Sequence, residues 1–309
     1  MNSVKYCASA IKRSSYSYSM PCAIICKTII TRQGLIYNMN VYTADIDNFT
    51  IGLLKECVSG KQYEISTRFR SEDDRKRSLL AHALLNRAVS ETYPGVPLPV
   101  ETVTDGFGKP HLFLPAGKDD PENSPKGDGN TETREIYFSL SHSGNLAMCA
   151  VDTNITGCDI ELIKEKKHGH ERIAARCFSA KELDLAGDTE GFYRIWTLKE
   201  SFLKAIGLGL RFPLDRFSIS DYDSQNGHCN FLVNDPDNVP SQLTPFVNTD
   251  SGVLSLTGTS MMIDGGYAVA FTRLCSDEKI TFHTISDPVN LLPDQYQRSP
   301  QISSHKSVQ

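Results

Sequence analysis

The chain lacks several features that mark common classes of protein. It has no excess of positive charge, because 32 lysines and arginines stand against 37 acidic residues, for a net charge of −5. A nucleic-acid-binding domain would normally be basic. It also lacks a run of about 18 apolar residues, the length that a membrane helix needs; residues 20–30 come closest and contain Lys27. We therefore expect neither nucleic acid nor a membrane among its partners.

The nine cysteines form no recognisable framework. Their number is odd, no C-x-x-C pair occurs, and the closest spacing is that of Cys22 and Cys26. No matching cysteine and histidine cluster elsewhere would complete a zinc site. Reduced thiols are typical of cytosolic proteins, so we expect a cytoplasmic location.

Acidic residues are absent from residues 1–44. This segment carries five basic residues among serines and tyrosines, but it has no clear amphipathic pattern and matches a transit peptide only weakly. The alternative is a disordered extension before a second candidate start at Met39. We favour that alternative and place residues 1–38 outside the folded part.

The remaining chain is long enough for one large domain or two modest ones, with 39% hydrophobic residues among 309. The predicted elements follow a similar order twice: strand, helices, strands. This order predicts an α+β fold of two similar α/β halves with mostly antiparallel sheets. We place the N-terminal half at residues 39–153, the C-terminal half at 154–273, and a polar, mobile segment at 274–309.

Hydrophobic periodicity and turn residues locate the elements of each half. Residues 115–134 are polar and rich in proline and glycine, and should form a surface loop. Ser179 and Glu182 are spaced like a capping box around a possible break in a helix. The expected helices are 48–57, 71–92, 170–185 and 191–206. The expected strands are 39–44, 136–140, 146–151, 155–162, 216–219, 228–233, 253–258 and 267–272.

Two acidic residues, Asp159 and Glu161, alternate along the expected strand 155–162. They should point to one face, with Cys158 and Ile160 on the other, apolar face. Neighbouring carboxylates repel each other, and a hard cation such as Mg²⁺, which prefers oxygen ligands, would offset that repulsion. The alternative is a solvated edge with two ordinary surface acids, because the D-x-E pattern is common.

The expected helix 191–206 carries charges in an unusual place. At 100° per residue, Lys199 falls within the apolar stripe, with Glu200 and Lys204 on its shoulder. A charge in a core-facing stripe is costly unless it is paired. Glu200 and Lys204 could form a simple helix salt bridge, but that alternative does not explain Lys199. We infer a polar cleft at this face of the helix.

The sequence Ser141-His142-Ser143 places several hydrogen-bond donors where a strand should end, which suits contacts with phosphate. A structural turn, or His142 as a base, are alternatives. A serine nucleophile is disfavoured because the G-x-S-x-G elbow is absent. The GFGKP sequence at 106–110 is not a phosphate loop, and the basic run at 74–77 by itself indicates a solvated helix face.

Together these motifs resemble those of the 4′-phosphopantetheinyl transferase superfamily, in its larger, surfactin-synthetase-activating type. The resemblance covers residues 39–291, and the chain departs from the family at Cys158, where an aliphatic residue is usual, and at Ser139, which replaces a common Asn. The motifs follow the family order: GKP at 108–110, SHS at 141–143, G-x-D-x-E at 157–161 and W-x-x-K-E-S-x-x-K at 196–204.

The resemblance implies transfer of 4′-phosphopantetheine from coenzyme A to a serine of an acyl or peptidyl carrier protein, which is holo-[acyl-carrier-protein] synthase activity. Adenosine 3′,5′-bisphosphate would be released. Mg²⁺ would be the cofactor, and coenzyme A would bind between halves related by a pseudo-twofold axis in a monomer. Two rivals stay open: a relative that binds coenzyme A or carriers without catalysis, and an unrelated Mg²⁺-dependent phosphohydrolase.

By the same resemblance, Asp159, Glu161 and Glu200 would hold Mg²⁺ with the diphosphate of coenzyme A. Glu200 would also take the proton of the serine hydroxyl, and Lys204 would stabilise charge on the departing bisphosphate. The other residues would contact coenzyme A. They are Lys199 and Lys204 along the phosphates, Ser141, His142, Arg77 and Ser78 at the 3′-phosphate, and Lys109 beside the adenine.

Overall fold

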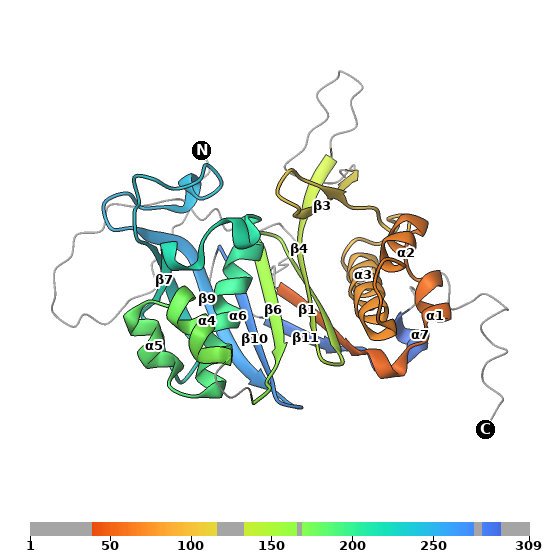
Figure 1. The fold of residues 1–309 in the computed structure, drawn as a ribbon. Coiled ribbons are helices and arrows are strands. Elements are labelled where there is room, and N and C mark those ends of the chain that lie inside the picture. The colour runs from red at the N-terminus through yellow and green to blue at the C-terminus, as the bar shows by residue number, and fades with distance from the viewer. Residues whose placement is uncertain (1–38, 116–132, 166–168, 275–279, 292–309) are drawn as a thin grey trace, which may run out of the picture.

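The computed structural model of the protein describes residues 39–115, 133–165, 169–274 and 280–291. The predicted extension at 1–38, most of the predicted loop at 115–134 and the end of the C-terminal segment lie outside the described residues. Two mostly antiparallel sheets stand side by side, and each carries one long helix (Figure 1). The predicted α+β class is confirmed.

The first sheet has the strand order β11-β1-β5-β4-β3-β2, and only β1 and β11 run parallel. Its helices pack on one face. The longest, α3, follows Ser71 and has three acids in its first turn, where they interact favourably with the helix dipole. The strands are β1 (Met39–Asp45), β2 (Val103–Thr104), β3 (Pro110–Pro115), β4 (Thr133–Ser143), β5 (Leu146–Asp152) and β11 (Ile280–Thr284), and the helices are α1 (Ile51–Glu56), α2 (Gly60–Ser66), α3 (Glu72–Thr92) and α7 (Pro288–Leu291).

The second sheet is antiparallel throughout, in the order β6-β10-β9-β8-β7. Helix α6 packs on it through buried residues such as Leu198 and Phe202, and α4 and α5 lie beside α6. The strands are β6 (Thr156–Leu162), β7 (Phe217–Ser220), β8 (His228–Val233), β9 (Val253–Ile263) and β10 (Tyr267–Arg273), and the helices are α4 (Gly169–Cys177), α5 (Ala180–Ala186) and α6 (Thr189–Ile206).

The two sheets face each other across a shared apolar layer. Along β1, Tyr42 and Ala44 face the helices of the first half, whereas Met39 and Val41 face the second sheet, as the period of two in a strand requires. The second sheet contributes side chains from β6 and β10 to this layer. They are Cys158, Ile160, Tyr267, Val269 and Phe271. The layers therefore run helix, sheet, sheet, helix.

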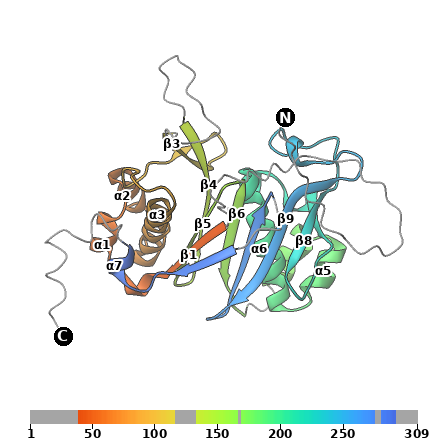
Figure 2. The ribbon, with the colours of Figure 1, turned by 180° about the vertical axis from the view of Figure 1, so that it is seen from behind.

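The structure corrects the predicted C-terminal segment. Residues 280–284, expected to be mobile, form β11 beside β1 (Figures 1 and 2), and Leu291 of α7 is buried in the first core. A short edge strand has little periodic signal of its own, so only its pairing with the start of the fold defines it. The capping box of Ser179 and Glu182 is confirmed and separates α4 from α5.

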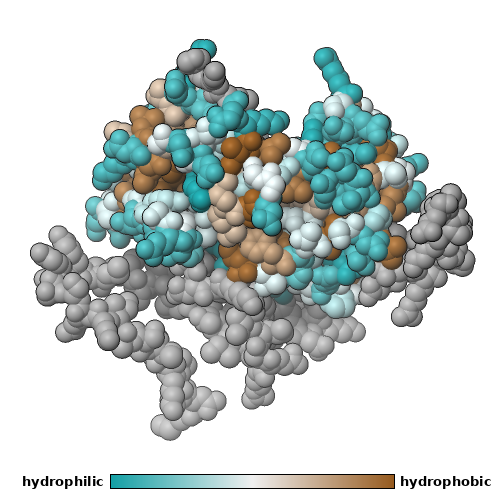
Figure 3. Space-filling view, turned by 90° about the horizontal axis from the view of Figure 1, so that it is seen from below, coloured by the Kyte–Doolittle hydropathy of each residue, from teal (hydrophilic) through white to brown (hydrophobic). Residues whose placement is uncertain are grey.

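Among the described helices, none has both the length and the apolar character to cross a bilayer. On the face seen from below, hydrophilic side chains dominate both outer sides, and hydrophobic ones gather along the middle (Figure 3).

Helix α6 lies directly against β6 at Gly157. A Cβ there would lie 1.9 Å from the carbonyl oxygen of Ser201 and 2.5 Å from the backbone nitrogen of Ala205. We therefore expect Gly157→Ala to lower the free energy of unfolding by about 2–3 kcal/mol, because the helix backbone must move away. Urea denaturation measures the change.

Gly60→Ala is the matched control. Nothing lies within 4 Å of a Cβ at Gly60, which opens α2, so this variant should be neutral or more stable by up to about 1 kcal/mol. Equal stability of the two alanine variants would contradict the close packing of α6 on β6.

Candidate active site

The acidic pair of β6 lies beneath helix α6. In the register with β10, Asp159 stands opposite Ala270, whose side chain lies in the core that α6 covers. Helix α6 begins after Asp188, which accepts a hydrogen bond from the backbone of Gly191, and ends at Gly207 in the left-handed conformation. The helix thereby carries Glu200 and Lys204 over the strand. The motifs that were separate in sequence meet here.

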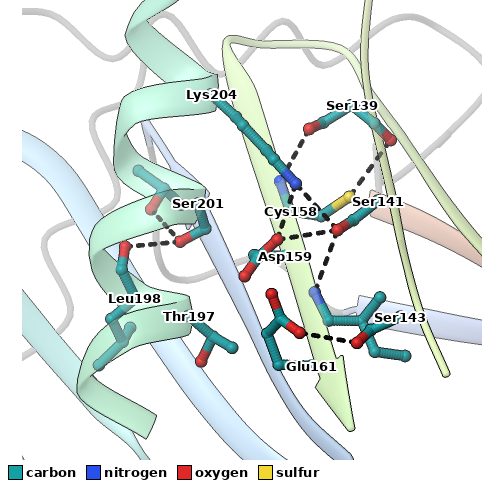
Figure 4. Close-up of polar contacts among 12 residues, drawn as sticks. Ser139, Ser141, Ser143, Cys158, Asp159, Glu161, Thr197, Leu198, Ser201 and Lys204 are labelled. Atoms are coloured by element: carbon teal, nitrogen blue, oxygen red, sulfur yellow. Dashed lines mark hydrogen bonds and ion pairs between the residues drawn. The ribbon is translucent and has the colours of Figure 1, made fainter. Parts of the chain in front are cut away.

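Lys204 forms the direct link between helix and strand (Figure 4). Its Nζ donates to Oδ1 of Asp159 at 2.7 Å and to Oγ of Ser141 at 2.8 Å. Loss of solvation lowers the pKa of Lys204, but the charges of Asp159 and Glu200 and the hydrogen bond to Asp159 contribute to a larger opposite shift, and the pKa is raised. Lys204 is therefore positively charged at the centre of the site.

Glu200 and Glu161 complete the acidic cluster. Burial raises the pKa of Glu161. A hydrogen bond of 2.7 Å from Oγ of Ser143 partly offsets this rise. Burial also raises the pKa of Glu200 to about 7, and the negative charges of Asp159 and Glu161 contribute to the rise. The negative charges of Asp159 and Glu161 therefore act on Glu200. Glu200 can hold or release a proton near neutral pH.

A ladder of serines joins β4 to the edge of β6 (Figure 4). The hydroxyl oxygens of Ser139, Ser141 and Ser143 accept the backbone N–H groups of three alternate β6 residues. These bonds run from Cys158 at 2.9 Å, Ile160 at 3.3 Å and Leu162 at 3.1 Å. Side chains of the first sheet therefore supply hydrogen-bond partners for the backbone N–H groups at the edge of the second sheet, where no neighbouring strand among the described residues pairs with β6.

Ser141 makes a contact that the sequence did not predict. Its hydroxyl proton goes to Oδ1 of Asp159 at 2.8 Å, and a serine has only one proton to donate. Ser141 therefore lies inside the acidic cluster, where it orients Asp159, and its contact with a phosphate stays a prediction.

The cluster fits a hard cation. Its ligands are carboxylate oxygens, which Mg²⁺ prefers, and Oδ2 of Asp159 is buried with no hydrogen-bond partner among the described residues. In the part of the chain that the structure describes, no three histidine, cysteine or acidic side chains converge as a ready-made metal cluster. Lys204 and Ser143 instead hold oxygens of Asp159 and Glu161. Asp159, Glu161 and Glu200 are the residues that could hold Mg²⁺.

Positive groups gather on the first-half side of the cluster. Nη1 of Arg77, on α3, donates to the carbonyl of Gly144 at 2.5 Å, so Arg77 lies beside the turn that follows Ser143. Loss of solvation lowers the pKa of His142, and the charges of Lys204 and Arg77 lower it further. The positive charges that act on His142 suit an anionic ligand.

Two other predicted residues make contacts with groups outside the acidic cluster. Ser78 is buried on α3, and its hydroxyl accepts a hydrogen bond of 3.5 Å from the amide of Gln62. Lys109 is oriented toward the second half, with Nζ on the carbonyl of Ala205. The backbone of the GKP turn borders a cavity of about 150 Å³, whose lining includes Gln62, His82, Asn86, Glu101, Gly108 and Pro110.

Lys199 contradicts its predicted role along the phosphates. The side chain is fully buried, and Nζ lies 3.0 Å from Oε1 of Glu182 and donates to the carbonyls of Leu214 and Phe217. Burial lowers the pKa of Lys199, and Glu182 opposes that shift. The apolar stripe of α6 therefore accommodates this charge through a buried pair and not through a cleft.

Two contributors escaped the sequence prediction. Ser143 holds Glu161, although the alternating serines of β4 opposite a D-x-E strand were a readable signal. For Glu182 the sequence indicated only a capping role. In the structure its carboxylate also accepts the N–H of Ile219 at 2.8 Å. The sequence gives no sign that α5 and α6 share this buried charge.

Comparisons with known proteins point to one family. A model of the 4′-phosphopantetheinyl transferase superfamily matches residues 155–248. A 4′-phosphopantetheinyl transferase of Bacillus subtilis is 34% identical over 184 residues, 58% of this chain and 72% of the relative. The transferase Sfp of B. subtilis strain 168 is 33% identical over 52% of this chain and 66% of its own length. The transferase gsp of Aneurinibacillus migulanus is 26% identical over 59% and 69%.

The buried pair predicts a stability effect. We expect Lys199→Met to lower the free energy of unfolding by about 3–5 kcal/mol, because it leaves the Glu182 carboxylate buried without a counter-charge. Adding Glu182→Gln, which retains a capping side chain, should recover part of the loss. Urea denaturation of both variants measures this. A stable Lys199→Met protein with a raised KM for coenzyme A would restore the predicted phosphate role.

Proposed function

The chain belongs to the 4′-phosphopantetheinyl transferase superfamily, and we propose that it transfers 4′-phosphopantetheine from coenzyme A to a serine of a carrier protein. One observation supports this activity most directly: the acidic pair of β6, Glu200 and Lys204 converge in one site. These residues come from the two motifs that are most specific to the family. Similar proteins bear this activity in their names.

The reaction requires a serine hydroxyl to attack a diphosphate, whose anionic oxygens repel a nucleophile. We propose that Asp159, Glu161 and Glu200 hold Mg²⁺. A bound Mg²⁺ would neutralise and orient the diphosphate. The uncoordinated Oδ2 of Asp159 and the purely oxygen donor set support this assignment.

The phosphate groups of coenzyme A are negatively charged, so they need positively charged side chains beside the acidic cluster. The charges of Arg77, on the first-half side, and of Lys204 both act on His142, so we propose that this side receives the 3′-phosphate. The cavity beside Gly108 and Pro110 lies next to the GKP turn, and we propose it for the adenine. One chain supplies all of these residues, which supports a monomer.

Proton transfer falls to Glu200 in this proposal. The serine hydroxyl must lose its proton as it attacks, and a base works best when its pKa is close to the working pH. Burial brings the pKa of Glu200 to about 7. Glu200 would accept the proton directly or through one water molecule.

Lys204 would stabilise the departing adenosine 3′,5′-bisphosphate. An ammonium group has three donors, and two of them reach Ser141 and Asp159. The third is available for a phosphate oxygen, where negative charge develops as the bond to the leaving group breaks.

The acceptor is a carrier domain of fatty acid, polyketide, nonribosomal peptide or lysine-pathway type. Incubation with labelled coenzyme A and a panel of such domains identifies it. Label on a carrier separates transfer from both rivals, because a non-catalytic relative releases no bisphosphate and a phosphohydrolase releases it without an acceptor. We also propose a cytoplasmic location, since the five cysteines that the structure describes are free thiols.

Glu200→Gln tests the proposed base. We expect kcat for carrier loading to fall by at least about 100-fold, because a general base contributes that much or more, while the circular dichroism spectrum stays unchanged. Glu190→Gln is the matched control, an exposed glutamate in the first turn of the same helix, and should load carriers normally. Normal turnover by Glu200→Gln would remove Glu200 from the mechanism.

Metal removal tests the cation. Excess chelator should stop carrier loading, and added Mg²⁺ should restore it, because the diphosphate charge is otherwise uncompensated. Calorimetric titration of Mg²⁺ should show weaker binding to Asp159→Asn than to wild type, independently of turnover. Full loading in chelator would exclude the proposed cofactor.

A further inference from the structure

The turn that carries the GKP motif reaches from the first sheet to the end of helix α6. Nζ of Lys109 donates a hydrogen bond of 2.6 Å to the carbonyl oxygen of Ala205. Lys109 belongs to the N-terminal half, whereas Ala205 lies in the last turn of α6, directly after Lys204. The contact therefore joins the two halves beside the acidic cluster.

The end of α6 has a physical need for such a donor. The last four carbonyls of a helix have no partner within it, and a cation near them also interacts favourably with the helix dipole. Gly207 ends the helix with φ of 76°, and a Cβ on it would lie 2.7 Å from Cδ of Lys109. The missing side chain at Gly207 thus leaves room for the stem of Lys109.

A second contact joins the same two segments. Arg211 donates from Nη1 to the carbonyl of Gly106 at 2.9 Å, and its guanidinium lies 5.6 Å from the ring centroid of Phe107. The turn is also held in shape, because the Asp105 carboxylate accepts the backbone N–H groups of Phe107 and Lys109. A shaped turn with one contact to the end of α6 and a second to the segment that follows it behaves as a docking element.

We propose that Lys109 is a positioning residue that docks this turn on the C-terminal end of α6 and thereby fixes Lys204 and Glu200 over β6. This role differs from the contact with adenine that the family resemblance implies, since the Lys109 ammonium binds a helix carbonyl. The catalytic consequence rests on the proposed transferase function. The docking itself does not depend on it.

Hydrogen exchange on the full chain, without any ligand, tests the docking. In Lys109→Met the amides of residues 203–209 should exchange at least about tenfold faster, because one charge-assisted hydrogen bond is lost. Lys55→Met is the matched control, an exposed lysine in the last turn of α1, and should leave this exchange unchanged. If the amides of residues 203–209 exchanged at the wild-type rate in Lys109→Met, the proposal would be overturned.

Transfer kinetics separate positioning from substrate binding. A positioning role predicts a kcat lowered by about tenfold with a KM for coenzyme A within about twofold of wild type. Lys109→Arg should recover part of the rate, because a guanidinium can also donate to the carbonyl. A raised KM with an unchanged kcat would assign Lys109 to coenzyme A and overturn the proposal.

Arg211→Met keeps the test decisive if Lys109→Met does not fold. It removes only the second contact and should accelerate exchange at the end of α6 to a smaller extent, and an unchanged rate there would count against docking. If the wild-type chain loads no carrier, the proposed function fails, whereas the exchange measurements still decide the role of Lys109.

Discussion

The free edge of β6 is the constraint on which the rest of the site depends. Its backbone N–H groups face the other sheet and need partners once they are buried. Serine hydroxyls of β4 accept them. A hydroxyl that accepts an N–H can still donate its own proton, and Ser141 and Ser143 donate theirs to Asp159 and Glu161. The interaction that joins the two sheets is therefore also the one that orients the acids.

Helix α6 is fixed against this edge along its length. Gly157 lets the helix backbone approach the strand, and the buried pair of Lys199 and Glu182 anchors the opposite side of the helix in the second core. Lys109 binds the carbonyl of the last turn. Rotation or sliding of α6 would break these contacts. The helix therefore holds Glu200 in one position relative to β6. Glu200 accordingly stands over the strand acids.

The electrostatics of the site follow from that placement. Three carboxylates with one lysine form a negative cluster, and burial intensifies their mutual repulsion, as the raised pKa values of Glu161 and Glu200 show. Arg77 lies on the first-half side of this cluster, and its charge and that of Lys204 lower the pKa of His142. Adjacent negative and positive regions suit a ligand that brings both a cation and phosphates, as a metal-bound diphosphate does.

The sequence alone determined the features that depend on local order. Strand alternation put Asp159 and Glu161 on one face and Cys158 on the other, and helical periodicity with a capping box located α6 and the break before α5. Tertiary structure decided which charges meet. On the helical wheel Lys199 falls within the apolar stripe and Lys204 on its shoulder, but the wheel does not identify their partners. Lys199 is paired inside the core with Glu182, and Lys204 reaches the acids. Strand β11 also depended on a distant partner. Periodicity reports the direction of a side chain from its own element, whereas the identity of its partner is set by packing between distant segments.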